Sequence, residues 1–128
     1  WTDARLSEDV PALGGLDGDR IPGVPKYAWG GSATWFFNVF DGVTGSMRAD
    51  YQYVGGSWNA FRYGRHEMPS YALTNLRFSV HKNRWEASLF FNNLVNERAI
   101  ITVNNNPAGQ YVTTAPPFTM GVSVRFTY

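Results

Sequence analysis

The chain has 128 residues and a formal net charge of +1, enough for one small domain. The near balance of its 11 basic and 10 acidic residues argues against a nucleic-acid-binding domain, and the lack of cysteine excludes disulfides and thiolate metal sites. Aromatic residues make up 16% and charged residues 16% of the chain, against about 25% charged residues in an ordinary globular domain. The chain begins at Trp1 without Met, and we expect it to be a mature piece or a fragment of something longer.

The first half of the chain predicts a short strand and a hairpin. The short strand covers Trp1 to Leu6, and a long connection over Ser7 to Lys26 follows it. Aromatic or small apolar residues alternate with polar ones from Trp29 to Val39, and again from Met47 to Tyr53. The turn formers Asp41 to Gly45 between these runs predict a hairpin.

The second half predicts another hairpin. Apolar and polar residues alternate from Asn75 to Val80 and from Arg84 to Leu94, where Phe90 breaks the polar side. We expect Lys82 and Asn83 to form a two-residue turn, because Asn tolerates the positive φ of a hairpin loop. This turn places Val80 opposite Trp85.

The last strand is the most regular, since Phe118 to Tyr128 alternate without a fault over about ten residues, the length of a tilted membrane strand. No run of about 20 apolar residues predicts a membrane helix. The fold class predicted is therefore all-β, an antiparallel up-and-down meander of about six strands. Tight and long connections alternate, so all long connections leave one end of the sheet. These long connections are 7–26, 55–70 and 95–116.

Seven short segments stand out along the chain: Thr2-Asp3-Ala4, Gly18 to Pro25, Tyr51 to Gly55, Met68 to Arg77, Trp85 to Leu94, Asn96-Glu97-Arg98 and Gly121 to Tyr128. In their order and spacing they resemble the C-terminal β-barrel of TonB-dependent outer-membrane receptors. The resemblance implies that residues 1–128 are the last strands of a 22-stranded transmembrane barrel, without its plug domain and remaining strands. Tyr128 stands where the family more usually ends in Phe.

The function implied by the resemblance is active uptake of a scarce nutrient across the outer membrane of a Gram-negative bacterium. The first candidate for this nutrient is a ferric siderophore. The implied partners are outer-membrane lipid and lipopolysaccharide, the receptor's own plug domain, TonB, the barrel-assembly machinery and the small-molecule ligand. Haem, cobalamin and oligosaccharide remain open as ligands. No cofactor, nucleic acid or enzymatic reaction is expected.

The predicted site residues fall into four groups. Ligand-binding candidates on an extracellular loop are Trp58, Arg62, Tyr63, Arg65 and His66. Residues expected to face the lumen and the plug are Arg48, Asp50, Arg77, Glu86 and Arg125. The aromatic girdles at the two membrane interfaces are assigned to Trp29, Tyr53, Trp85 and Tyr128. The C-terminal assembly signal is assigned to Phe126 and Tyr128.

Less specific interpretations of the same residues stay open beside these assignments. The loop residues also fit a solvated loop, and the charges also fit a generic polar lumen. His66 beside Glu67 does not predict a metal site, because adjacent residues on an extended segment point apart. The chain as a whole also fits another outer-membrane barrel, such as a porin-like channel or the end of an autotransporter. A soluble all-β carbohydrate-binding module is the second alternative.

Overall fold

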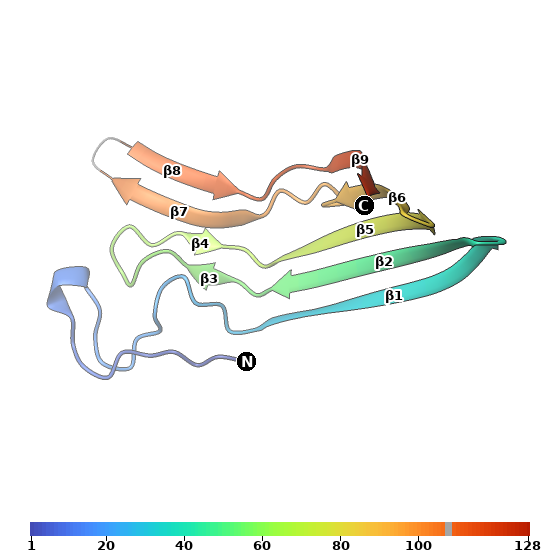
Figure 1. Ribbon diagram of the computed structural model, residues 1–128. Helices are drawn as coiled ribbons and strands as arrows, with labels where there is room; N and C mark the ends of the chain where they lie inside the picture. Colours follow the sequence, from blue (N-terminus) through green and yellow to red (C-terminus); the bar gives the residue numbers. More distant parts are fainter. Residues whose placement is uncertain (107–108) are drawn as a thin grey trace. The chain divides into compact units, whose positions relative to one another are not determined.

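A five-stranded sheet forms the main part of the computed structural model, which describes residues 1–106 and 109–128 (Figure 1). Its strands are β1 (Ala28–Phe40), β2 (Val43–Val54), β5 (Tyr71–Lys82), β6 (Trp85–Asn92) and β9 (Thr119–Phe126). Their order in the sheet is the order of these strands along the chain, so the sheet is an up-and-down meander. The predicted all-β, antiparallel class is confirmed, and the sheet is open, with β1 and β9 at its edges.

Two small hairpins lie in segments that the sequence did not assign to strands. They are β3 (Ser57–Trp58) with β4 (Glu67–Met68), and β7 (Ile100–Asn106) with β8 (Gly109–Thr114). A short 3-10 helix, η1, covers Pro11–Leu13. The strand predicted over Trp1 to Leu6 is wrong: its only β-type pairing in the described chain is an isolated bridge between Arg5 and Arg20. Within the described residues, no helix is long and apolar enough to cross a membrane.

The predicted alternation of tight and long connections is confirmed. Two-residue turns, Asp41–Gly42 and Asn83–Arg84, join β1 to β2 and β5 to β6. Gly42 and Asn83 adopt φ angles of 72° and 52°, the left-handed conformation that Gly and Asn tolerate best. The connections from β2 to β5 and from β6 to β9 are long and carry the small hairpins.

The register of the β5–β6 hairpin corrects the prediction. Lys82 lies opposite Trp85 and Val80 opposite Ala87, so the expected pairing of Val80 with Trp85 is wrong by two residues. The reason is that the turn begins one residue later than predicted, at Asn83 rather than Lys82. Because side chains alternate with a period of two, this shift leaves every side chain on its expected face.

Strands β5, β6 and β9 sort their side chains onto two faces. What we call the apolar face carries Phe78, Val80, Ala87, Leu89, Val122 and Val124. What we call the polar face carries Arg77, Ser79, Glu86, Ser88, Ser123 and Arg125. On the polar face the hydroxyl oxygens of Ser79 and Ser88 lie 2.8 Å apart, within hydrogen-bonding distance.

Phe90, which breaks the alternation, is accommodated on the polar face by a glycine. It lies opposite Gly121 of β9, and a Cβ atom at Gly121 would be 2.5 Å from the ring's Cζ atom. The missing side chain therefore leaves room for the ring. The guanidinium of Arg77 lies 5.9 Å from the centroid of this ring, close enough for a cation–π contact.

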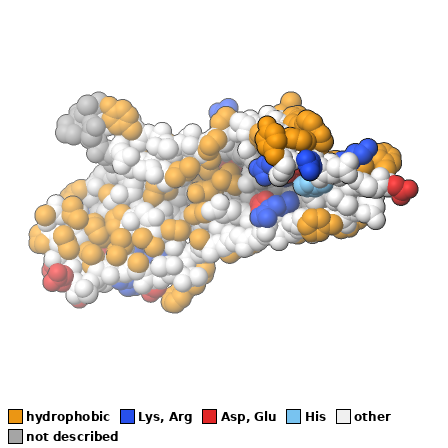
Figure 2. Space-filling view, viewed as in Figure 1, with side chains coloured by type: hydrophobic (Ala, Val, Ile, Leu, Met, Phe, Trp, Pro, Cys, Tyr) orange, Lys and Arg blue, Asp and Glu red, His pale blue; other side chains and the backbone are white. Residues whose placement is uncertain are grey.

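The chain divides into two compact units, which we describe separately. The loop unit comprises Trp1–Trp29, Tyr53–Ala72 and Arg98–Ala115. The sheet unit comprises Gly30–Gln52, Leu73–Glu97 and Pro116–Tyr128. Among the described residues, four of the five buried hydrophobic residues belong to the loop unit: Met68, Ala99, Val103 and Ala115, with Val43 in the sheet unit. Hydrophobic side chains are widespread on the surface seen in Figure 2.

A buried asparagine organises the chain where β6 ends. The Asn93 side chain donates to the carbonyl oxygens of Glu97 and Pro116 at 2.9 and 2.8 Å, and accepts a bond from the Glu97 N–H at 2.8 Å. Its own N–H donates to the Asn75 side chain at 2.9 Å. With a φ of 49°, Asn93 thus ends the strand and ties it to both neighbouring segments of the sheet unit.

Candidate ligand-binding pocket

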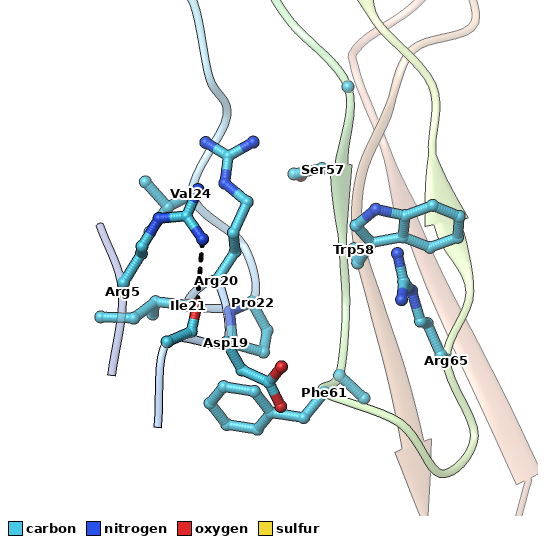
Figure 3. A pocket seen from close by; sticks show the side chains of 13 residues that line it. Arg5, Asp19, Arg20, Ile21, Pro22, Val24, Ser57, Trp58, Phe61 and Arg65 are labelled. Atoms are coloured by element: carbon cyan, nitrogen blue, oxygen red, sulfur yellow. Dashed lines mark hydrogen bonds between the residues drawn. The ribbon is translucent and has the colours of Figure 1, made fainter. Parts of the chain in front are cut away.

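A pocket of about 260 Å³ lies entirely within the loop unit (Figure 3). One wall comes from the N-terminal segment, with Arg5 and the stretch from Gly18 to Val24. The other comes from β3 and the segment after it, including Trp58, Phe61 and Arg65. Figure 3 shows the Ser57 side chain on this second wall pointing toward Arg20. The pocket is therefore framed by segments about 40 positions apart in the chain.

Backbone hydrogen bonds set the first wall. The N–H of Leu6 donates to the carbonyl oxygen of Asp19 at 2.8 Å, and the N–H of Gly18 donates back to Leu6 at 3.0 Å. Gly18 has a φ of 78°, which lets the chain turn back on itself. The two stretches consequently run antiparallel, and Arg5 pairs with Arg20 as an isolated bridge.

The two arginines share one carboxylate. The Nε of Arg5 donates to both oxygens of Asp3, at 3.1 and 3.2 Å, and the Nε of Arg20 lies 3.9 Å from Asp3. Arg5 also donates to the carbonyl oxygen of Gly18 at 3.0 Å. Asp3 partly offsets the repulsion that two like charges opposite each other create.

The second wall is held by β3 and by a stacked pair of side chains. The Trp58 carbonyl oxygen accepts a hydrogen bond from the N–H of Gly23 at 2.7 Å, which fastens the two walls together. The Arg65 guanidinium carbon lies 3.6 Å from the centroid of the Trp58 ring. This cation–π stack keeps the guanidinium against the indole.

Asp19 carries the negative charge of the pocket lining. Its carboxylate accepts a hydrogen bond from the Leu16 N–H at 3.0 Å and pairs with Arg62 at 3.3 Å. The Leu16 N–H bond and, after it, the Arg62 guanidinium hold the pKa of Asp19 below the ordinary value of 3.8. The carboxylate is therefore ionised at neutral pH.

The predicted ligand-binding residues separate into two sets. Trp58 and Arg65 line the pocket, whereas Arg62 reaches it only through Asp19. Tyr63 is 87% exposed and lies beside Gly14, where a Cβ atom would be 3.1 Å from the ring. His66 is bound locally, with its Nδ1 donating to the Gly64 carbonyl oxygen at 2.8 Å. Within the described residues, no three His, Asp or Glu side chains gather as metal ligands would.

A second pocket, of about 470 Å³, adjoins the first in the same unit. It is lined by Leu6, Leu13, Ile21, Pro22, Asn59, Ala60 and Phe61. Of these, Ile21, Pro22, Ala60 and Phe61 line both pockets. The two adjoining pockets therefore combine a charged compartment with an apolar one.

The residues expected to face a lumen lie in the sheet unit and mostly pair with each other. Arg48 donates to Asp50 of the same strand, with a shortest distance of 2.7 Å. Arg125 lies 3.9 Å from Glu86 across β6 and β9. The fifth, Arg77, contacts the ring of Phe90 described above.

The aromatic residues assigned to girdles form contacts near the strand ends. The rings of Trp29 and Tyr53, near the long connections of β1 and β2, have centroids 5.9 Å apart. Near the tight turn of β6, Trp85 lies 4.8 Å from Phe126, which lies 5.4 Å from Tyr128. Phe126 thus belongs to the same cluster as the C-terminal residue.

Sequence reasoning did not identify Arg5, Arg20 or Asp19 as site residues. The available signal was the Gly18 to Pro25 segment, which resembles a receptor loop but was not connected with a pocket. Comparison of the chain with known protein families, with curated proteins and with solved structures finds no match.

Proposed function

We propose that this chain is a barrel-wall segment of a TonB-dependent outer-membrane receptor that takes up a scarce nutrient, with a ferric siderophore as the first candidate. The observation that carries the proposal is the burial of the two faces of the main sheet. Beyond that, the proposal draws on the resemblance of the sequence segments, on the open edges and on the connections.

The apolar face is exposed, while two paired serines of the polar face are buried. Leu89 is 40% and Val122 is 70% exposed, whereas Ser79 and Ser88 are 6% and 4% exposed. A water-soluble sheet with one covered face covers its apolar side. A barrel wall in a bilayer instead turns its apolar side to lipid and its polar side to the lumen. The apolar face therefore favours a lipid environment.

The two edges of the sheet support a larger assembly. All but one of the 13 residues of β1 are exposed, and β9 ends the sheet at the other side. Backbone groups on an open edge find no partner in lipid, so a membrane sheet must close on itself. Additional strands of a barrel would pair with both edges.

The connections and aromatic contacts fit the same proposal. Tight turns at one end and long segments at the other are typical of outer-membrane barrels, whose tight turns face the periplasm. Aromatic contacts at Trp29–Tyr53 and at Trp85–Phe126 lie toward opposite ends of the strands, as expected for two interfacial girdles. Arg48, Asp50 and the other lumen candidates would then hydrogen-bond the plug domain.

A soluble carbohydrate-binding module is less well supported. Such a module needs a core, and in the described part of the chain no large side chain is completely buried. A porin-like channel or an autotransporter end would share the exposed apolar face, and only the resembling segments argue against them. The plug domain is what distinguishes a receptor from both.

The first test is to read the coding sequence upstream of Trp1, and the second is a transport assay in cells. We expect the upstream sequence to encode further alternating strands and, before them, a plug domain. Cells lacking the gene should then lose TonB-dependent uptake of one radiolabelled ferric siderophore and regain it on complementation. A barrel without a plug would contradict the receptor proposal, and unchanged uptake of all chelates tested would contradict the assignment to iron.

A further inference from the structure

We propose that the paired pockets of the loop unit bind an amphiphile that carries a phosphate group, with the phosphate among the arginines and the apolar part in the adjoining pocket. The proposal goes beyond the function above and rests only on the geometry of these pockets. Its first support is electrostatic. Three arginines, Arg5, Arg20 and Arg65, line the charged pocket against one carboxylate, Asp19. That carboxylate is already paired with Arg62, so an excess of positive charge remains.

The placement of Arg5 opposite Arg20 is costly for the fold. Like charges at directly opposed positions destabilise a pair of strands, and the single carboxylate of Asp3, which bonds Arg5 at 3.1 Å, approaches Arg20 only to 3.9 Å. Local conflicts of this kind are expected where a residue serves function rather than stability. An anion between the two guanidinium groups would relieve the repulsion, because each presents several N–H donors.

The guanidinium of Arg65 is already oriented to bind such an anion. Its guanidinium stacks on Trp58 at 3.6 Å, and no described residue forms a hydrogen bond or ion pair with it. The stack orients the planar group before binding, which reduces the entropy lost on binding. Ser57, whose side chain points toward Arg20 in Figure 3, adds a hydroxyl donor from the opposite wall. Donors from several directions suit the tetrahedral oxygens of phosphate better than one planar carboxylate.

The sizes of the pockets indicate an amphiphile. The charged pocket, at about 260 Å³, is smaller than the roughly 300–1,000 Å³ that encloses a drug-sized ligand. It therefore accommodates one charged group rather than a whole ligand. The adjoining pocket of about 470 Å³ shares Ile21 and Phe61 with it and is lined mainly by apolar side chains. A molecule with a phosphate at one end and a hydrocarbon portion at the other matches both.

The test is calorimetric titration of the full chain, kept in an amphipol, with inorganic phosphate, hexyl phosphate and heptanoate. We expect hexyl phosphate to bind at least about tenfold more tightly than inorganic phosphate, because each buried CH₂ group adds hydrophobic transfer energy. It should also bind at least about tenfold more tightly than heptanoate, because a phosphate presents more negative charge and more acceptor oxygens to the arginines. Inorganic phosphate and hexyl phosphate separate a free anion from a lipid-like one. Heptanoate has a similar chain but a carboxylate in place of the phosphate.

Variants assign the two parts of the ligand to the two pockets. Arg20→Gln and Arg65→Gln should each weaken both phosphate ligands about tenfold or more, whereas Phe61→Ala should weaken only hexyl phosphate. The matched control is Arg98→Gln, at an exposed arginine of the same unit that lines neither pocket. Arg65→Gln removes the stack on Trp58 and an attraction to Asp19 but no hydrogen bond to a described residue, so it also serves if Arg20→Gln fails to fold. Circular dichroism of each variant verifies folding.

Five results would overturn the proposal. The first four are no binding of hexyl phosphate, equal binding by both arginine variants and the unmodified chain, equal affinity for heptanoate, and equal affinity for inorganic and hexyl phosphate. The fourth would assign the pocket to free phosphate. Loss of binding in Arg98→Gln as well would show a general effect of net charge, and would also overturn the site.

Discussion

The loop unit and the sheet unit differ in how far they bury their hydrophobic side chains. The loop unit lacks long regular strands of its own, yet it contains most of the buried hydrophobic residues, including Met68 and Val103. The sheet unit has the regular pairing, yet its apolar residues, such as Val122 and Met120, stay exposed. Regular hydrogen bonding and burial of apolar side chains are therefore separate properties in this chain.

The largest expected effect is that of a charge on the apolar face. In the full barrel proposed above, Val122→Arg should lower the free energy of unfolding in lipid vesicles by up to about 4 kcal/mol, because lipid cannot solvate the guanidinium. The matched control is Ser123→Arg, its exposed neighbour on the polar face, which should cost less than about 1 kcal/mol. Ser88 is unsuitable as a control because it is buried and bonded to Ser79. Equal losses for the two variants would reject our assignment of the faces.

Methionine truncation compares the two units with the same change. Met68→Ala should cost about 3 kcal/mol, since Met68 is 6% exposed and its removal leaves a cavity. Met120→Ala, at a residue 68% exposed in the sheet unit, should cost less than about 1 kcal/mol. Both are measured by denaturant unfolding in the same medium. A larger loss at Met120 would mean that the apolar face is packed against protein.

The Asn93 bonds predict an intermediate effect. Asn93→Ala should destabilise the sheet unit by about 2 kcal/mol, because it leaves partly buried groups of Glu97 and Pro116 without partners. The exposed neighbour Asn92 provides the control, and Asn92→Ala should change stability by less than about 0.5 kcal/mol. Faster hydrogen exchange at the Glu97 amide in the first variant would locate the loss. Unchanged exchange there would contradict this account.

The smallest effect concerns pH and the loop unit. Because the folded pKa of Asp19 lies below its ordinary value of 3.8, its stabilising contacts are fully present above that pH. They are lost as the pH falls through the lowered pKa, when the protonated carboxyl releases the Leu16 N–H and Arg62. An NMR titration should show the Leu16 amide shifting below about pH 4. Asp19→Asn should abolish that shift, and a shift that persists would assign it to another carboxyl group.

The sequence predicted the features of the fold that depend on local pattern. Alternation identified the main strands, and Gly and Asn identified the turns. The register was wrong because a pattern of period two is almost unchanged by a slip of two residues, and only the position of Asn83 resolves it. The β7–β8 hairpin was missed because its amide-rich sequence, around Asn104, looks like a loop.

The pocket was less accessible to sequence reasoning. Trp58 and Arg65 were identified because aromatic and basic residues cluster in one loop. Arg5 and Arg20 were missed because their approach depends on hydrogen bonds between segments that are separated by a long irregular stretch. No periodicity predicts such pairing. The predicted 95–116 loop also covers residues 107–108, which lie outside the described residues.

The tolerance of the sheet for slips of two residues also bears on how such a sheet changes in evolution. Lengthening β5 and β6 together by two residues each keeps every side chain on its original face, whereas a single inserted residue in one strand inverts all that follow it. The pairs Ser79–Ser88 and Phe90–Gly121 are the contacts that a slip would break. Strands of this sheet should therefore grow and shrink by even numbers of residues, while the long connections are free to vary by any number.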